Sequence, residues 1–399
     1  MKTRTLLLVC TIPAILCSTT QAKIIYVDDD RPADFNNIQD AINYADINDT
    51  VFVSEGTYYE NIEMKNGISL VGAGAENTII DGGKKGHVVI FNLANGEIKG
   101  FTITNSGTKP GYLSGIFLSQ SFVKIENNLI INNNGGVSVT SNSYAEIKNN
   151  KIMNNTGWSN VFLDTASRAL IENNIISGSP FLGIDGSQGT ITVVNNTIVN
   201  NNLSVVYKPG PNQVCIDNII AYNQYGILIE GDSKLSMFKI SNNDVWKNSI
   251  SNYWYEWGSV CNIEDPCCIP QGYSGPFEPQ PGTGEISSDP SFVDPNHGDY
   301  HLKSQAGRFD PKSQTWMYDD VTSPCIDTGE PNSPIGYETF PNGGYINMGA
   351  YGGTAEASKS YFGKPVCDTI VAGDINGDCK VDEADLEILM LHWLENHNP

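Results

Sequence analysis

The sequence has few charged residues, and basic residues are the scarcest among them. Only 17% of its 399 residues are charged, with 23 Lys and Arg against 45 Asp and Glu. The formal net charge of −22 argues against nucleic acid or an anionic membrane as the main partner, because both would repel so acidic a chain. Beyond the N-terminus, no apolar run is long enough to span a membrane. The acidic composition suits solubility outside the cell or calcium binding.

The one long apolar run lies at the N-terminus and has the features of a secretory signal. Lys2 and Arg4 precede a run over 6–17, and Thr20 and Ala22 place small residues at the −3 and −1 positions. We therefore expect cleavage after Ala22, so that 1–22 is a signal peptide and the mature protein is secreted or displayed at the cell surface.

An asparagine phrase repeats six times, and it predicts the architecture. Each copy has an apolar residue three positions before the Asn and a branched apolar residue two positions after it. The asparagines are Asn128, Asn150, Asn174, Asn196, Asn218 and Asn243. A period of 22 to 25 residues with apolar residues in register is typical of a solenoid, and the local alternation predicts short strands. The Leu-x-x-Leu-x-Leu frame of a leucine-rich repeat is missing, so we predict an all-β parallel β-helix with the asparagines stacked as an amide ladder at a turn.

The remaining segments divide the chain around this solenoid. We expect an N-terminal cap and first coils over 23–80, with a short amphipathic helix over 35–43, and regular coils over 81–250. Irregular closing coils with long insertions are predicted over 251–355, and a linker with a small C-terminal module over 356–399. The cap is needed because the terminal coil of a solenoid otherwise exposes unpaired strand edges.

Four segments of the cap carry a family resemblance. They are Tyr26-Val-Asp-Asp-Asp30, Ile38-Gln-Asp-Ala-Ile42, Glu55-Gly-Thr-Tyr-Tyr59 and Thr78-Ile-Ile-Asp-Gly82. Together with the repeats, over about 23–250, the chain resembles secreted right-handed β-helix proteins of the pectate-lyase-like superfamily. That resemblance implies a fold more than an activity, since the superfamily includes lyases, glycosidases, epimerases, esterases and non-catalytic surface proteins. The chain lacks the paired-Asp, Gly-His-Gly and Arg-Ile-Lys set of polygalacturonases and the Asp-Pro-His of alginate epimerases.

Stacking the coils places several ionisable residues on one face. In the strand that opens each repeat, the second and fourth residues point inward, and the third and fifth point outward. The outward positions of successive coils then bring Asp164, Asp185, Lys208 and Glu230 together, with Arg168 in the adjoining turn. This face is the candidate catalytic site, although a solvated strand face with one or two ion pairs fits the same pattern.

Two reactions fit this face. A uronan lyase would hold Ca²⁺ on Asp164 and Asp185, use Lys208 as the base and bind substrate through Arg168. Glycoside hydrolysis would instead use Asp164 and Asp185 as acid and base. We therefore expect a carbohydrate-active protein that binds, and as an enzyme degrades, an extracellular acidic polysaccharide. The alternative is a non-catalytic surface or matrix protein that uses the solenoid as a rigid scaffold.

An acidic loop near the C-terminus has calcium-ligand spacing. Its predicted ligands, with position 7 contributing a backbone carbonyl, are Asp374, Asn376, Asp378, Lys380, Asp382 and Asp385. A helix is predicted over 384–395. The segment resembles a dockerin repeat, which implies a cohesin-like or surface partner, but Cys379 replaces the usual Gly and only one repeat is present. The cofactor prediction is Ca²⁺.

The cysteines suggest a mixture of thiols and disulfides. Cys215 occupies an apolar column of the repeats and is predicted to be a free thiol in the core. Export permits two bridges among Cys261, Cys267, Cys268 and Cys325 and one between Cys367 and Cys379, with the connectivity open.

Overall fold

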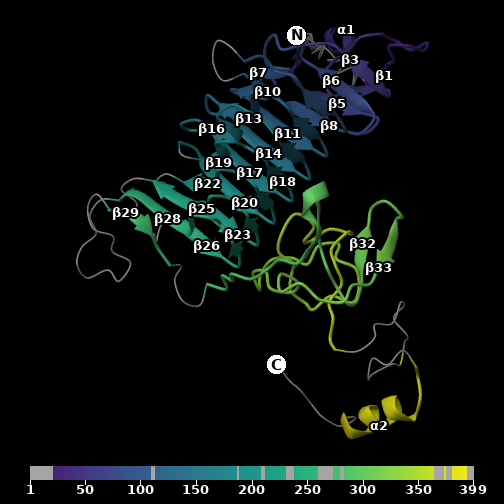
Figure 1. Cartoon of the computed structure of the whole chain (residues 1–399). Coiled ribbons are helices and arrows are strands. Elements are labelled where there is room, and N and C mark those ends of the chain that lie inside the picture. The colour runs from purple at the N-terminus through teal and green to yellow at the C-terminus, as the bar shows by residue number, and fades with distance from the viewer. Residues whose placement is uncertain are drawn as a thin grey trace, which may run out of the picture.

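Three parallel sheets wind into a β-helix, as the asparagine phrase predicts (Figure 1). The computed structural model describes residues 21–108, 113–186, 188–207, 212–230, 238–258, 273–278, 283–363, 373 and 380–392. The signal peptide prediction falls on residues that lie almost entirely outside this set. No helix among the described residues is both long and apolar enough to cross a membrane.

Each coil contributes one short strand to each sheet. Sheet A contains β1 (Ile24–Val27), β2 (Thr50–Val53), β5 (Ile68–Gly72), β8 (Gly96–Lys99), β11 (Phe122–Glu126), β14 (Tyr144–Lys148), β17 (Arg168–Glu172), β20 (Thr190–Val194), β23 (Gln213–Ile216) and β26 (Phe238–Ser241). Sheet B contains β3 (Gly56–Tyr58), β6 (Thr78–Asp81), β9 (Thr102–Thr104), β12 (Leu129–Ile131), β15 (Lys151–Met153), β18 (Ile175–Ser177), β21 (Thr197–Val199), β24 (Ile219–Ala221) and β27 (Asp244–Trp246). Sheet C contains β4 (Ile62–Glu63), β7 (Val89–Asn92), β10 (Ser114–Ser119), β13 (Gly135–Thr140), β16 (Ser159–Leu163), β19 (Leu182–Gly186), β22 (Leu203–Tyr207), β25 (Tyr225–Glu230) and β28 (Ser251–Gly258), with β29 (Tyr273–Pro276) added antiparallel at its end.

The phrase asparagines form a buried ladder at the turn between sheets A and B. The side-chain amide of Asn174 donates to Oδ1 of Asn196 at 3.0 Å, and that of Asn196 donates to Oδ1 of Asn218 at 3.1 Å. At the C-terminal end Glu285 takes the place of the next asparagine, accepting from Nδ2 of Asn243 at 2.7 Å. The residue before each ladder asparagine has a positive φ, a backbone conformation that Asn and Asp tolerate better than most residues. The ladder is confirmed.

A second asparagine ladder, which the sequence analysis missed, stands at the turn between sheets B and C. Its members lie five residues after those of the first ladder and are Asn133, Asn155, Asn201, Asn223 and Asn248. Asn201 donates through Nδ2 to Oδ1 of Asn223 at 3.2 Å, and Asn223 donates likewise to Asn248 at 3.0 Å. Ser179 occupies one position, so the row is interrupted there. Two ladders fix two of the three corners of each coil.

The N-terminal end of the solenoid is covered by α1 (Ile38–Tyr44). Ile38, Ala41 and Ile42 are fully buried on its inner face, so the predicted cap is present. The helix begins three residues later than predicted. Asn37 is its N-cap and accepts from the backbone N–H of Asp40, while Glu60 accepts from the first backbone N–H groups of the helix.

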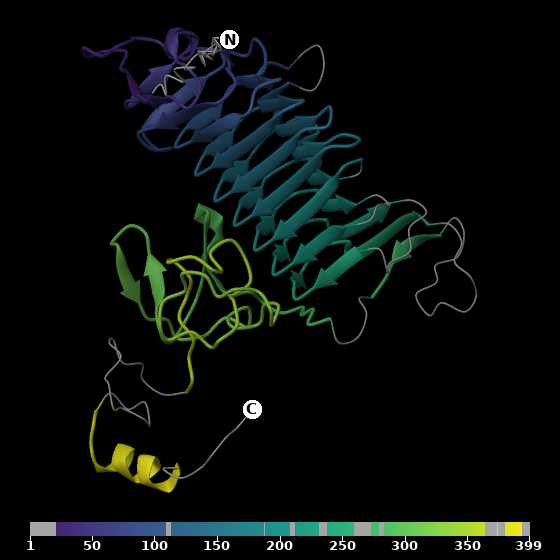
Figure 2. The same cartoon turned by 180° about the vertical axis from the view of Figure 1, so that it is seen from behind.

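The segment after the solenoid differs from the prediction of closing coils. Its described strands form two antiparallel pairs, β30 (Phe292–Asp294) with β31 (Asp299–Leu302) and β32 (Arg308–Asp310) with β33 (Thr315–Met317). A 3₁₀ turn, η2 (Pro295–His297), joins the first pair. The segment lies beside the solenoid rather than extending it (Figure 2). It packs an apolar cluster onto the outer face of sheet B, which is why β18, β21 and β24 are buried on both faces.

Outward-pointing polar residues at the turn between sheets A and B hold this segment in place. Asn195 donates to the carbonyl of Asn347 at 2.8 Å. Buried Asp217 accepts from the backbone N–H of Glu330 at 2.6 Å and from the hydroxyl of Ser333 at 2.7 Å. Each of these residues directly precedes a ladder asparagine, so the same turn serves the core ladder and the docked segment.

Neither described cysteine forms a disulfide. Cys215 is a free, fully buried core thiol, as predicted. Cys325 is also free and buried, and its thiol donates to Asp244 at 3.1 Å, so its predicted place in a bridge is wrong. The chain returns to the side of sheet B at this point, which puts Cys325 inside the docking interface. The other cysteines of the predicted bridges, at 261, 267, 268, 367 and 379, lie outside the described residues.

Buried carboxyl groups make the stability of the docked segment depend on pH. Burial raises the pKa of Asp244 to about 6 and that of Glu338 to about 7. Because these values exceed those in the unfolded chain, roughly 4, the stabilising contribution is complete below pH 4 and is lost as the pH rises through about 7. We expect the melting temperature to be higher at pH 5 than at pH 8. Glu338→Gln, which keeps the acceptor for the backbone N–H groups of Asn347 and Gly353, should reduce that difference, and an unchanged difference would contradict the assignment.

The C-terminal module is described only in part. The helix α2 (Glu383–His392) starts and ends close to the predicted bounds, and Asp385 accepts from the backbone N–H of Asp382 at 2.9 Å. Lys380 and Asp382 are exposed, whereas Asp385 is buried. The other predicted ligands, Asp374, Asn376 and Asp378, lie outside the described residues, so the calcium loop stays a prediction.

Candidate functional site

The outer face of sheet C has the register that the sequence predicts. Phe162 of β16 pairs with Asp185 of β19, Asp185 pairs with Val206 of β22, and Val206 pairs with Leu228 of β25. Residues on either side of these positions, such as Ile184 and Val205, lie in the solenoid core. The third position of each strand therefore points outward, and a single outward row runs along the solenoid axis.

A second row lines the edge of the same face, where the chain enters sheet C. Four successive coils contribute Asn134, Trp158, Phe181 and Asn202, and all four line one pocket. The Trp158 and Phe181 rings stack with centroids 6.4 Å apart and planes at 14°. Their exposed fractions are 46% and 49%, so both rings keep large faces open to solvent. The row is an aromatic pair between two amide side chains.

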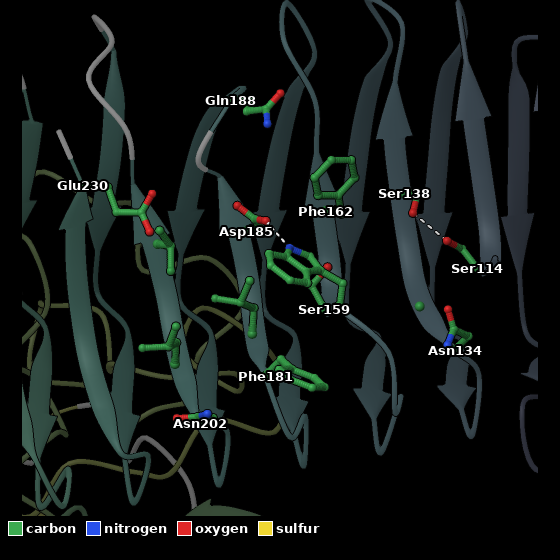
Figure 3. A pocket seen from close by; sticks show the side chains of 15 residues that line it. Ser114, Asn134, Ser138, Ser159, Phe162, Phe181, Asp185, Gln188, Asn202 and Glu230 are labelled. Carbon is green, nitrogen blue, oxygen red and sulfur yellow. Dashed lines mark hydrogen bonds between the residues drawn. The ribbon is translucent and has the colours of Figure 1, made fainter. Parts of the chain in front are cut away.

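Asp185 connects the two rows. Its Oδ2 accepts from the indole N–H of Trp158 at 2.7 Å, and the residue is only 3% exposed. This bond fixes the Trp158 ring at the edge of the pocket, which has a volume of about 400 Å³. Figure 3 shows Phe181 and Asp185 near its middle, with Glu230 toward one end and Ser138 toward the other.

Ser114 and Ser138, which line the N-terminal end of the pocket, belong to a cluster of hydroxyl groups and an imidazole. The hydroxyls of Ser114 and Ser138 are 2.5 Å apart and buried. The backbone N–H of Ser114 donates to Nδ1 of His87. The His87 ring stacks on the Phe117 ring with the two centroids 4.3 Å apart. Burial lowers the pKa of His87, so this imidazole is neutral at pH 7 and adds no positive charge.

The predicted catalytic residues divide among different places. Asp185 and Glu230 line the same pocket. Asp164 does not line it, because its carboxylate accepts from the backbone N–H of Ser141 at 2.9 Å and from the hydroxyl of Ser167 at 2.7 Å. It therefore holds the turn between sheets C and A. Lys208 lies outside the described residues.

Arg168 lies on another face of the solenoid, which corrects its predicted place in a turn beside sheet C. It is the first residue of β17 in sheet A, where it pairs with Tyr144 and Thr190. The connection from β16 to β17 is only four residues long, so the chain has already turned to the next sheet at Arg168.

The described residues of the pocket do not match a calcium site of the kind predicted. Both oxygens of Asp164 are engaged in the turn, and Asp185 is bonded to Trp158. Among the described residues, the metal-ligand atoms that gather in a group of three belong to Asp28, Asp29 and Asp30, in the N-terminal cap.

The pocket is suited to holding a linear sugar polymer. Flat aromatic faces with polar groups at their edges bind the apolar faces of sugar rings, and the flanking amides offer donors and acceptors to hydroxyl groups. Asp185 and Glu230 lie two coils apart, roughly 10 Å along the axis, and two residues apart along the strand direction, so their spacing exceeds both the roughly 5.5 Å of a retaining glycosidase and the roughly 6.5–9.5 Å of an inverting one. Binding is therefore better supported by this geometry than two-carboxylate hydrolysis.

Family comparison agrees with the solenoid. The family model described as "Right handed beta helix region" matches residues 21–157 and 135–266, which together exceed half of the chain. A second model, described as "Disaggregatase related", matches residues 259–329. The search of curated proteins gave no match.

The solved structures that match this chain are distant in sequence. The A-module of the mannuronan C-5 epimerase AlgE6 from Azotobacter vinelandii matches with a TM-score of 0.41 and 15% identity over 55% of this chain and 73% of that chain. Pectate lyase Pel9A matches with a TM-score of 0.44 and 12% identity over 83% of this chain and 96% of that chain. The alginate lyase of Paenibacillus sp. str. FPU-7 matches with a TM-score of 0.32 and 16% identity over 57% and 88% of the two chains.

Proposed function

The chain belongs to the family of proteins with a right-handed β-helix region, and on that premise we propose that it is a secreted protein that binds an extracellular polysaccharide along sheet C. The observation that carries the proposal is the row of Asn134, Trp158, Phe181 and Asn202 in four successive coils. Coils repeat about every 4.8 Å along the axis, so the row presents regularly spaced contacts to a regularly repeating polymer. The apolar rings would stack on sugar rings and the amides would bind their hydroxyls.

The pocket on the outer face of sheet C is called the groove from here on. Its charge affects which polysaccharide it can bind. Asp185 and Glu230 are acidic, and no Lys or Arg is among the described residues that line the pocket. Carboxylates repel an acidic polysaccharide, so the binding of such a polymer along this face needs positive charge to balance them, from Ca²⁺ or from Lys208. The acidic substrate and the lyase reaction therefore depend on Ca²⁺ or Lys208, whereas a neutral polymer needs neither.

Binding to a panel of immobilised polysaccharides, with and without Ca²⁺, tests the proposal. The panel should contain neutral glucans and xylans, galacturonan, alginate and chondroitin sulfate. We expect retention on at least one polymer and its loss in the double variant Trp158→Ala, Phe181→Ala. If every polymer passes through unretained, or if the double variant is retained as strongly as the natural protein, the groove does not bind polysaccharide.

The same polymers decide whether binding leads to cleavage. A lyase would produce unsaturated ends that absorb ultraviolet light, and a hydrolase would release reducing ends without that absorbance. Asp185→Asn keeps an oxygen acceptor for the indole N–H of Trp158 and removes the charge. If Asp185 is catalytic, this variant should lose product formation while keeping affinity. Binding without either product would identify a non-catalytic carbohydrate-binding scaffold. The hydrogen bonds that Asp164 and Asp185 accept from other residues of the chain favour this alternative.

A further inference from the structure

Sheet A carries its own row of side chains, which is separate from the groove on sheet C. Phe122, Tyr144 and Arg168 occupy the first position of β11, β14 and β17 and lie in register on three successive coils. The Phe122 and Tyr144 rings stack with centroids 5.1 Å apart and planes at 20°. Phe122 is 45% exposed and Arg168 is exposed, so the row faces solvent. These three strands are neighbours in the middle of the solenoid (Figure 1).

A hollow lies beside this row. Its volume is about 450 Å³, and its lining includes Tyr144, Arg168, Thr190, Thr192 and Asn212. Two hydroxyls and one amide thus stand around an aromatic ring and a guanidinium group. The apolar floor comes from Ala169 and Leu170 of β17. The hollow combines a flat stacking surface, a cation and several neutral hydrogen-bonding groups.

Arg168 is the informative member of the row, because this cation has no partner among the described residues of a strongly acidic chain. The net charge is −22, yet among the described residues the Arg168 guanidinium makes no ion pair and no hydrogen bond. The acidic residue of the same strand, Glu172, stands at its other end, four residues or about 13 Å away, and pairs with Lys148 at 2.8 Å. The guanidinium is therefore free to bind an anion from outside the chain, and its planar fork suits a carboxylate or a sulfate.

We propose that the Phe122, Tyr144 and Arg168 row on sheet A is a second carbohydrate-binding site, specific for an anionic sugar unit. The sugar ring would lie on the Tyr144 and Phe122 rings, and its carboxylate or sulfate would accept from Arg168. Thr190, Thr192 and Asn212 would bind its hydroxyl groups. The site goes beyond the groove on sheet C in both place and chemistry, because the groove is lined by carboxylates and this one by a cation. It does not require the groove to be functional.

Titration calorimetry in a groove-silenced background reads the sheet A site alone. The background is the full-length protein with Trp158→Ala and Phe181→Ala, and the probes are short oligomers of galacturonate, of κ-carrageenan and of cellulose. They present a carboxylate, a sulfate and no charge respectively. We expect the background protein to bind at least one anionic oligomer and to bind the cellulose oligomer more weakly. Adding Arg168→Ala should weaken the anionic affinity about tenfold or more, and Arg168→Lys should restore part of it.

Two control variants make the outcome decisive. Lys151→Ala removes one positive charge from an exposed position at the start of β15 on sheet B, and we expect it to change the affinity less than twofold. Tyr144→Ala should weaken binding of the anionic oligomers through loss of the stacking surface. The proposal is overturned if the background protein binds neither anionic oligomer, or if Arg168→Ala and Lys151→Ala have equal effects. Preference for galacturonate or for κ-carrageenan would identify the anionic group.

Because the groove residues are already replaced in the background protein, a negative result there leaves the sheet C proposal standing. Failure of the natural protein to bind any polymer of the panel would count against both sites.

Discussion

Replacing Asn174 with alanine is expected to lower the free energy of unfolding by about 4 kcal/mol, among the largest effects of any single substitution in this chain. Asn174 is fully buried in the middle of the first ladder. Its amide donates to the carbonyl of Ile147 at 2.7 Å, and its Oδ1 accepts from the backbone N–H of Asn150 at 2.9 Å. Alanine leaves both backbone groups buried without these partners, and each such group costs roughly 1 to 3 kcal/mol.

The effect should be larger than the local hydrogen-bond count suggests, because the ladder is continuous. Asn174 also bonds to Asn196 on one side and to Asn150 on the other, so the substitution interrupts stacking between neighbouring coils. Urea unfolding of the natural protein and the variant measures the difference.

Asn92→Ala is the matched control for the ladder. Asn92 lies in β7 and is exposed, so its loss should change the stability by less than about 0.5 kcal/mol. An Asn174→Ala protein as stable as the Asn92→Ala protein would show that the ladder does not hold the coils together.

Replacing Trp158 with alanine is expected to weaken polysaccharide affinity about 30-fold, corresponding to roughly 2 kcal/mol of binding free energy. The ring supplies an exposed flat surface at the edge of the groove, and its indole N–H donates a hydrogen bond to Asp185. Alanine removes the stacking surface and leaves Phe181 without its ring partner. The affinity for the polymer retained in the panel gives the measurement.

Two further variants separate the contributions to this effect. Trp158→Phe keeps an aromatic face and removes the N–H donor, so we expect it to retain most of the affinity if stacking dominates. Tyr59→Ala removes an aromatic residue that is 77% exposed in the N-terminal cap, away from the groove, and should leave affinity unchanged. If Tyr59→Ala weakens binding as much as Trp158→Ala does, the sugar does not select the groove.

The solenoid was predictable because one short phrase encodes both its core and its turn. Apolar residues at fixed offsets from Asn128 and its equivalents fill the interior, and the asparagines themselves form the ladder. The second ladder has the same kind of signal, since Asn133 and its equivalents recur five residues later, but Ser179 interrupts this second column.

The segment after the solenoid could not be placed from sequence. The segments around 289–302 and 345–351 have short stretches of alternating apolar residues. This pattern fits a closing coil of the solenoid and a docked hairpin equally well. Which one forms depends on whether another apolar surface is available. Here the outer face of sheet B offers Val199 and Ile219, which bury Tyr300 and Met348. This docking also explains why Cys325 is a thiol bonded to Asp244 rather than half of a disulfide.

The candidate site was predictable in its register and missed in its aromatic residues. Alternation along the strands correctly placed Asp185 and Glu230 on the outside of sheet C, in one pocket. Asp164 has the same position in its repeat as Glu230, but its carboxylate binds the turn between sheets C and A. The four-residue connection from β16 to β17 places Arg168 in sheet A. Trp158 and Phe181 lie four positions before Phe162 and Asp185, two residues ahead of the start of the aligned repeats, so repeats aligned over two more residues would include them.

A crystal structure with a bound oligosaccharide, taken from the polymer that the panel identifies, tests the central claim most directly. The account predicts that the sugar chain follows the solenoid axis on sheet C, with rings over Trp158 and Phe181 and a hydroxyl near Asp185. A sugar bound elsewhere, with both rings left uncovered, would contradict the proposed polysaccharide-binding groove.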